Sequence, residues 1–260
     1  MLPSVYFSNT SFALLTPLAV VYSLAVHLWA YVRGDPPISP LPPLLLSAAV
    51  ENDHNDDDNN NKKRKKLAIV TGANTGIGYE TAKSLAMGYG MTVILACRSR
   101  DKGERAVKQI RSEGGKGAVF VEPLDLSSSQ SIEKFATAVK DKFGTVDILV
   151  NNAGRNSSGD PVQGRDLLFQ TNFLGHFELT SYLMGAFAPQ ARVVNLSSVM
   201  HHFIEGDVNQ PSFWKDCIAY DKHPTSTYQP SKLAAILFSM ELNKRYPDKI
   251  QAVAVNPGGV

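Results

Sequence analysis

The chain has 260 residues, enough for one α/β domain with an extension, and 43% of them are hydrophobic, enough for a sizeable core. A formal net charge of +2 is too small to indicate a nucleic-acid partner. The only two cysteines, Cys97 and Cys217, form neither a CxxC pair nor a disulfide framework. This excludes the disulfide-rich secreted class and favours a reducing compartment such as the cytosol.

The first element in chain order is an apolar span at residues 11–32, which contains no Asp, Glu, Lys or Arg. Its length matches the roughly 20 residues that a bilayer-spanning helix needs. A cleaved signal peptide is the alternative, but no basic segment precedes the span, and its length exceeds the usual apolar region of about 7–15 residues. We therefore expect residues 1–33 to form a membrane anchor. Positive charges follow the span at Arg33 and residues 62–66, which places the rest of the chain on the cytosolic side.

Residues 34–66 are predicted to be a linker. Residues 36–43 are rich in proline and should be extended. Residues 51–61 are almost entirely Asn and Asp, and such a composition cannot bury enough apolar surface to fold. The basic run 62–66 can bind anionic lipid headgroups or serve as a solvated guard before the first strand, and the sequence does not decide between the two.

From residue 67 onward, short β-rich runs alternate with helical patterns, which is typical of βαβ units and a parallel sheet. The predicted strands are residues 67–70, 92–96, 118–122, 147–151, 191–197 and 250–256. The predicted helices are residues 77–88, 102–113, 128–143, 167–187 and 228–246. We therefore predict that residues 67–260 form one α/β domain with a doubly wound parallel sheet.

A glycine-rich loop, Thr71-Gly72-Ala73-Asn74-Thr75-Gly76-Ile77-Gly78, follows the first predicted strand and leads into a predicted helix. A strand, a glycine turn and a helix N-terminus together make an anion site that fits the pyrophosphate of a dinucleotide. A tight turn without a nucleotide is the alternative, and it suits an isolated glycine pattern better than this context. We therefore predict a dinucleotide site at Gly72, Asn74, Thr75, Gly76, Ile77 and Gly78.

The residue that follows the second predicted strand should select the dinucleotide. A carboxylate there would bind the ribose 2′-hydroxyl of NAD. This chain instead has Arg98, whose planar guanidinium suits a phosphate, so we expect NADP(H) as the cofactor. An ordinary surface arginine at the end of a strand is the alternative interpretation.

Tyr228 and Lys232, in the run Tyr228-Gln229-Pro230-Ser231-Lys232, form the strongest catalytic signal. Residues four apart lie on one face of a helix, so the lysine ammonium can favour the phenolate and let the tyrosine exchange a proton near neutral pH. Carbonyl reduction with a nicotinamide needs such a proton donor. The pattern also arises by chance, so its weight depends on the glycine loop and the βαβ pattern upstream. Pro230 is tolerable if Tyr228 lies in the first helical turn.

These motifs, in this order, resemble those of the short-chain dehydrogenase/reductase family. The resemblance rests on the glycine spacing, on Asn151-Asn152-Ala153-Gly154 and on the Tyr-Lys pair, and it covers residues 66–260. It implies a Rossmann fold. Within the family the chain is most similar to membrane-anchored retinol-dehydrogenase-like reductases, on residues 96–103 and 172–177 and on Ser231-Lys232-Leu233-Ala234. Protochlorophyllide reductases are a weaker second match. The resemblance implies a lipophilic substrate, such as a retinoid, a steroid or another alcohol, aldehyde or ketone.

The resemblance also implies roles for individual residues. Asn172 would complete a proton relay, and Ser198 would bond the substrate oxygen, with Ser197 as the near alternative. Lys232 would also hold the nicotinamide ribose, and Asp125 would lie against the adenine, although its Asp-Leu-Ser run can also be a helix N-cap. The implied catalytic set is Asn172, Ser198, Tyr228 and Lys232. Beyond the glycine loop, the implied cofactor-binding set is Arg98, Asp125, Asn152, Ala153, Gly154, Tyr228, Lys232, Pro257 and Gly258.

The interval between Ser198 and Tyr228 is longer than in typical members of the family. It contains five large apolar residues: Phe203, Ile204, Phe213, Trp214 and Ile218. Two interpretations of this interval stay open. It can be an apolar flap over a lipophilic substrate, or a loop that caps the core. His201 and His202 are adjacent rather than spaced for ligation on one helical face, so no metal site is predicted.

The sequence ends in Asn256-Pro257-Gly258-Gly259-Val260, where the family contacts the nicotinamide. The resemblance implies a further strand and helices, so we expect a C-terminally truncated domain, either a fragment or a relative without turnover. Two functions stay open. One is an NADP(H)-dependent oxidoreductase for a lipophilic carbonyl, anchored in the endoplasmic reticulum membrane and facing the cytosol; the other is a catalytically silent nucleotide-binding or scaffold protein. The substrate, the reaction direction and the oligomeric state also stay open.

Overall fold

The computed structural model describes residues 64–114, 117–220 and 226–258. The expected membrane anchor at residues 11–32 and nearly all of the expected linker lie outside these ranges. Within them, no helix is both long and apolar enough to cross a bilayer.

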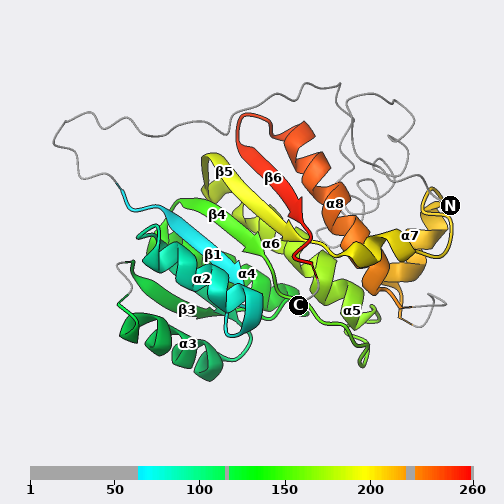
Figure 1. The fold of residues 1–260 in the computed structure, drawn as a ribbon. Coiled ribbons are helices and arrows are strands. Elements are labelled where there is room, and N and C mark those ends of the chain that lie inside the picture. Colours follow the sequence, from blue (N-terminus) through cyan, green and yellow to red (C-terminus); the bar gives the residue numbers. More distant parts are fainter. Residues whose placement is uncertain (1–63, 115–116, 221–225, 259–260) are drawn as a thin grey trace.

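A parallel sheet of six strands in the order β3-β2-β1-β4-β5-β6 forms the centre of the domain (Figure 1). Its strands are β1 (Leu67–Thr71), β2 (Thr92–Cys97), β3 (Val119–Pro123), β4 (Val146–Asn151), β5 (Phe187–Leu196) and β6 (Ile250–Val255). All neighbouring strands pair in parallel. The order starts near the middle at β1 and runs outward in both directions, so the predicted doubly wound Rossmann-type sheet is confirmed.

Strand β1 is buried along its whole length because it lies between β2 and β4 and has helices over both faces. Successive side chains alternate between the two faces. Leu67 and Ile69 pack into one hydrophobic cluster, whereas Ala68 and Val70 pack into another. The apolar run of this strand therefore forms a core on each side of the sheet.

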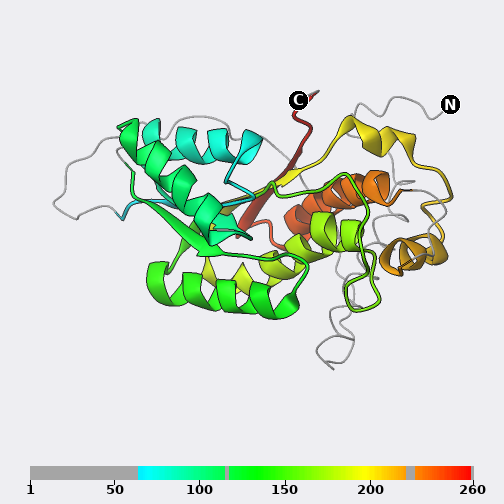
Figure 2. The same ribbon diagram turned by 90° about the horizontal axis from the view of Figure 1, so that it is seen from below.

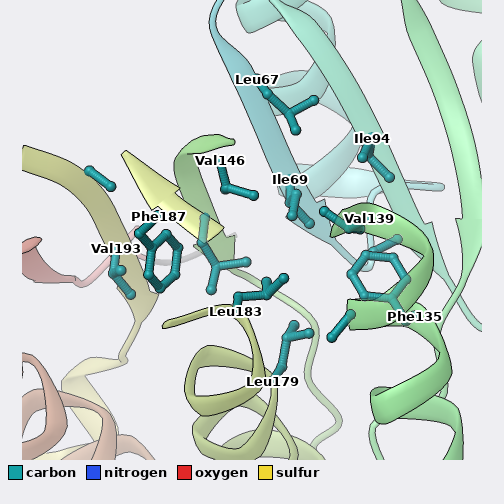
Figure 3. Close-up of a cluster of buried hydrophobic side chains, with 14 of the residues drawn as sticks. Leu67, Ile69, Ile94, Phe135, Val139, Val146, Leu179, Leu183, Phe187 and Val193 are labelled. Carbon is teal, nitrogen blue, oxygen red and sulfur yellow. The ribbon is translucent and has the colours of Figure 1, made fainter. Parts of the chain in front are cut away.

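Helices cover both faces of the sheet (Figures 1 and 2). On one face lie α2 (Gly76–Met87) and α3 (Arg100–Ser112), and on the other lie α4 (Ser129–Phe143), α6 (Gly175–Leu183) and α8 (Tyr228–Arg245). Figure 3 shows the core on the second face, where side chains of α4 and α6 meet those of the strands. Its labelled members include Ile69, Ile94, Phe135, Val139, Leu179, Leu183 and Val193.

The prediction of one continuous helix over residues 167–187 is wrong in two respects. The segment consists of α5 (Leu167–Phe169), a π-helical turn η2 (Gln170–Leu174), α6 and a 3-10 turn η3 (Met184–Ala186). Phe187 is the first residue of β5, where it pairs with Val146. A change from α to π register leaves the apolar spacing almost unaltered, and for that reason the sequence pattern does not reveal it.

The insertion before Tyr228 contains two helices that the sequence pattern did not predict, η4 (Val199–Phe203) and α7 (Pro211–Ile218). Proline at the first position suits the start of α7. Trp214 is 2% exposed and its ring lies 6.5 Å from that of Phe169, whereas Phe203 is 62% exposed. Much of the insertion therefore caps the core, as one of the two interpretations held, and η4 presents apolar surface to solvent.

Strand β6 has one covered face. The side chain of Asn243 in α8 accepts a hydrogen bond from the Ala252 amide at 2.7 Å and donates to the Ala252 carbonyl at 2.8 Å, which fastens this helix to the strand. Val253 and Val255 are 49% and 40% exposed. Helices α2 and α3 pack over β1, β2 and β3, at the far side of the sheet from β6 (Figure 1).

Candidate active site

The glycine loop and the run Asn152-Ala153 lie together where β1 and β4 end. The Thr71 hydroxyl accepts hydrogen bonds from the amides of Asn152 and Ala153, each at 2.9 Å. The Asn152 side chain donates to the Thr71 carbonyl at 2.7 Å, and the Gly72 amide donates to Ala96 of β2 at 2.8 Å. The loop is therefore held by hydrogen bonds to β2 on one side and to the residues that follow β4 on the other.

The geometry of this loop fits a dinucleotide pyrophosphate. Gly72 has a φ of +66°, and a Cβ there would lie 2.9 Å from the Ala153 Cα, so the close approach requires glycine. A Cβ on Gly76, whose φ is +58°, would meet nothing within 4 Å, so the loop is open on that side. The N-cap Thr75 makes no side-chain cap, and the first turn of α2 carries no acidic residue, so the helix start can accept an anion.

Asn74 and Ile77 are half-buried in this loop, and Thr75 and Gly76 are exposed. Arg98 directly follows β2 and is also exposed. Asp125 accepts hydrogen bonds from the amide and the hydroxyl of Ser127, at 2.9 and 2.6 Å. The cap of α4 is Ser128. Asp125 thus organises the turn before α4, but the interpretation of the Asp-Leu-Ser run as the N-cap is wrong, because Ser128 caps the helix.

Tyr228 is the first residue of α8, so Pro230 lies in the first helical turn, where its missing N–H does little harm. The ammonium of Lys232 lies over the Tyr228 ring, 5.4 Å from its centroid, and donates to the Leu196 carbonyl at 3.0 Å. Lys232 is 6% exposed, and this burial lowers its pKa to about 8. The lysine is therefore held next to the phenol by the end of β5.

Asn172 lies in the π-helical turn and reaches the same place. Its side chain accepts from the Arg155 amide at 2.8 Å and donates to the Arg155 carbonyl at 2.9 Å and to the Ser231 hydroxyl at 3.4 Å. A Cβ on Gly154 would lie 3.4 Å from Asn172 Oδ1 and 3.8 Å from Lys232 Nζ. The structure thus brings Asn172, Gly154 and Lys232 together.

The two serines after β5 differ in their contacts. The Ser197 hydroxyl is buried and donates to the Lys232 carbonyl at 2.8 Å, whereas the Ser198 hydroxyl accepts from the Met200 amide at 3.3 Å at the start of η4. Ser197 is therefore bound to the backbone of α8, which favours Ser198 as the serine for a substrate. Pro257 and Gly258 follow β6 and are exposed. The Ser197 amide at the end of β5 donates to the Val255 carbonyl at the end of β6, at 2.8 Å. Pro257 and Gly258 therefore lie near the ends of β5 and β6, as Ser197 does.

Sequence reasoning missed His176, which is buried behind the site. Its Nδ1 lies 3.2 Å from the Asn172 carbonyl, and because a carbonyl only accepts, Nδ1 donates there. Its Nε2 then accepts from the Thr71 hydroxyl at 2.9 Å. Burial, together with the charge of Lys232, lowers the pKa of His176 to about 4, so the ring is neutral. The four-residue spacing from Asn172 was the only sequence signal for this contact.

Among the residues that the structure describes, no three His, Cys, Asp or Glu side chains gather as a metal site would require. The rings of His201 and His202 are 3.9 Å apart, and Nδ1 of His201 lies 2.5 Å from the Ser198 carbonyl. Both histidines lie in η4, at the start of the insertion.

Lys232 should make the stability of the fold depend on pH. Its folded pKa is about 8 against an ordinary value of 10.5, so between these values the unfolded chain holds a proton that the folded chain has released. The unfolding free energy therefore rises with pH across this window, by up to about 3 kcal/mol. We expect urea unfolding to show this rise in the wild type and not in Lys232→Met. The difference between the two proteins cancels the titration of other groups, and a difference independent of pH would contradict the low pKa.

The sequence is similar to a family model and to proteins of known activity. A family model described as short chain dehydrogenase matches residues 66–209. The chain is 40% identical over 206 residues to retinol dehydrogenase 11 of Mus musculus, which covers 75% of this chain and 61% of that protein. It is 42% identical over 195 residues to retinol dehydrogenase 13 of Mus musculus, with coverage of 73% and 57%. The chain thus spans about three fifths of the length of these relatives.

Solved structures give the same fold. The menthone neomenthol reductase of Mentha piperita superimposes with a TM-score of 0.60 at 26% identity, over 74% of this chain and 89% of that one. An actinorhodin polyketide ketoreductase with NADPH has a TM-score of 0.57 at 29% identity, over 75% and 71%. A short chain dehydrogenase/reductase of Burkholderia phymatum, in complex with NAD, has a TM-score of 0.59 at 23% identity, over 75% and 66%. Both nicotinamide dinucleotides therefore occur among chains of this fold.

Proposed function

The chain belongs to the short chain dehydrogenase family and is similar to retinol dehydrogenases within it, and from this premise we propose that it transfers a hydride between NADP(H) and a lipophilic alcohol, aldehyde or ketone. The observation that carries the proposal is the position of Lys232 over the Tyr228 ring, beside Asn172 and Gly154. This arrangement supports an acid–base centre beside the glycine loop.

In the proposed reaction, the bound nicotinamide supplies or accepts the hydride. Tyr228 gives a proton to the substrate oxygen in reduction and removes it in oxidation. The ammonium of Lys232 stabilises the phenolate, and the Leu196 carbonyl keeps this ammonium in place. Ser198 donates a hydrogen bond to the same substrate oxygen, and Asn172 connects Lys232 to the proton relay.

The cofactor site that we propose is built from both sides of the glycine loop. Gly72, Asn74, Thr75, Gly76, Ile77 and Gly78 would hold the pyrophosphate, with support from the closely packed backbone of Asn152, Ala153 and Gly154. Asp125 would lie at the adenine, Arg98 at the 2′-phosphate, Lys232 at the ribose, and Pro257 and Gly258 at the nicotinamide. The glycine geometry supports the first of these assignments, and the exposure of Arg98 leaves its guanidinium accessible.

The proposed chain organisation has a membrane anchor within residues 1–33, a linker at 34–66 and a catalytic domain at 67–260. The charge-free span 11–32 and the basic run after it support an anchor in the endoplasmic reticulum membrane with a cytosolic domain. Phe203 on η4, which follows Ser198, offers apolar surface at 62% exposure and supports a lipophilic substrate.

The test is the consumption of NADPH and NADH by the full chain in detergent micelles, with all-trans-retinal and medium-chain aldehydes as substrates. Turnover with NADPH above that with NADH is expected. Binding of NADPH without turnover of any of these carbonyls would favour the alternative, a catalytically silent nucleotide-binding or scaffold protein. A protein that binds neither dinucleotide would contradict the proposed oxidoreductase and leave only the scaffold.

Arg98→Ala should change the choice of cofactor. A charge-assisted contact with a phosphate contributes roughly 1.5–3 kcal/mol, so the Kd for NADPH is expected to rise about 10- to 100-fold and the Kd for NADH to stay the same. Fluorescence titration with both dinucleotides measures this. Lys108→Ala removes the same charge from an exposed position further along α3 and is the matched control. Equal weakening by the two variants would show that Arg98 acts only through net charge.

A further inference from the structure

Asp166 lies at a junction of three elements that surround the candidate active site. Its Oδ1 accepts from the Phe169 amide at 2.7 Å, which caps α5, and from the Thr227 hydroxyl at 2.6 Å. Its own amide donates to the Ile218 carbonyl at the end of α7, at 2.9 Å. One residue thus contacts the helix that leads to Asn172, the insertion and the residue before Tyr228.

The Thr227 hydroxyl donates its proton to Asp166 and makes no side-chain cap on α8. A threonine at the N-cap normally accepts a hydrogen bond from the amide of the second or third helical residue. In α8 the third residue is Pro230, which has no amide proton, and Thr227 makes no side-chain cap. Thr227 is 5% exposed, so its hydroxyl needs a partner, and Asp166 provides it.

The end of the insertion is fastened to the same segment of chain. The Tyr220 amide donates to the Gly164 carbonyl at 3.2 Å, and Arg165 forms an antiparallel bridge with Ala219. With the bond from Asp166 to Ile218, these contacts fix residues 218–220 against residues 164–166. A displacement of Asp166 would therefore move the insertion as well as the start of α8.

The contacts form a closed ring through the candidate site. Asp166 bonds Thr227, which precedes Tyr228; the Tyr228 carbonyl accepts from the Ser231 hydroxyl at 2.6 Å. That hydroxyl accepts from the Asn172 side chain at 3.4 Å, and the chain from Asn172 returns through η2 and α5 to Asp166. Because the ring is closed, the position of Tyr228 relative to Asn172 depends on the bond between Asp166 and Thr227.

We propose that Asp166 is a positioning residue, which through Thr227 holds Tyr228 in register with Asn172 and links both to the insertion. The inference rests on the proposed function, since it assigns a role within that reaction. Small displacements of a reacting group lower the rate far more than they lower binding. Loss of the contact should therefore lower kcat and leave the Kd for NADPH unchanged.

The test compares Thr227→Val, which removes the hydroxyl and keeps the shape, with Thr227→Ser, which keeps the hydroxyl. In the full chain, Thr227→Val is expected to lower kcat by about tenfold, and Thr227→Ser to stay within about twofold of the wild type. Hydrogen exchange of residues 226–232 without substrate should become faster in the Val variant alone. Equal kcat and equal exchange in the two variants would overturn the proposal.

Asp166→Ser provides a second, independent variant. Serine still caps α5 but is too short to reach Thr227, so it separates capping from positioning. The proposal expects the same tenfold loss of kcat, in order of magnitude, with an unchanged Kd for NADPH. Wild-type kcat in Asp166→Ser would contradict it. If the wild type itself shows no turnover, the proposed function fails. In that case the difference in hydrogen exchange between Thr227→Val and Thr227→Ser alone decides whether the bond between Asp166 and Thr227 positions the start of α8.

Discussion

Replacement of Tyr228 by Phe is expected to lower kcat by about a thousandfold, in the range that general acid–base groups contribute. The phenyl ring keeps the shape of the side chain and its position under the Lys232 ammonium, 5.4 Å from the ring centroid. The substitution removes only the hydroxyl that exchanges the proton. The Kd for NADPH should therefore stay within about twofold, because a cation over an aromatic face is retained.

Steady-state rates with a saturating aldehyde, together with a fluorescence titration of NADPH, measure the two quantities. Tyr246→Phe is the matched control, since that tyrosine follows α8 and is 38% exposed. It should have the rate of the wild type. Turnover by Tyr228→Phe at the wild-type rate would remove the phenol from the mechanism, whereas loss of both rate and binding would indicate a misfolded site.

Replacement of Gly78 by Ala is expected to disrupt the cofactor loop. A Cβ at this buried position would lie 2.7 Å from the Gly72 carbonyl and even closer to Asn152 Nδ2. Neither group can move freely, because the Asn152 side chain is bonded to the Thr71 carbonyl. We expect the unfolding free energy to fall by about 1–3 kcal/mol, as in other overpacked sites. The Kd for NADPH should rise more than about tenfold, because the same loop would hold the pyrophosphate.

Gly185→Ala is the control for this substitution. A Cβ there would meet no atom within 4 Å, and its φ is not positive. Urea unfolding and NADPH binding should therefore match the wild type. If Gly78→Ala behaves like Gly185→Ala, the close approach of the glycine loop to Asn152 does not constrain the site.

The parts of the fold that the sequence predicted depend on local signals. The glycine loop was recognisable because a strand, a turn and a helix start follow one another directly in sequence, and the strands because each is a short apolar run between helical patterns. The Tyr228–Lys232 pair was recognisable because its spacing is that of one helical face. In each case the information lies within a few neighbouring residues.

The parts that were missed depend on contacts between distant segments. The role of His176 requires Thr71, which belongs to the first strand, and the role of Asp166 requires Thr227. Helix α7 is stabilised by the burial of Trp214 against Phe169, which is separated from it by a strand and four other helical segments. A pattern of residue types along one segment carries no information on such partners.

Strand β6 has a consequence for how the protein behaves in solution. Val253 and Val255 leave about half of their surface to water, and among the described strands β6 pairs with β5 alone. An apolar strand with a free edge is a template for the addition of another chain. Within the described residues, the outer edge of β6 is therefore open to a further strand, from the same polypeptide or from a second copy.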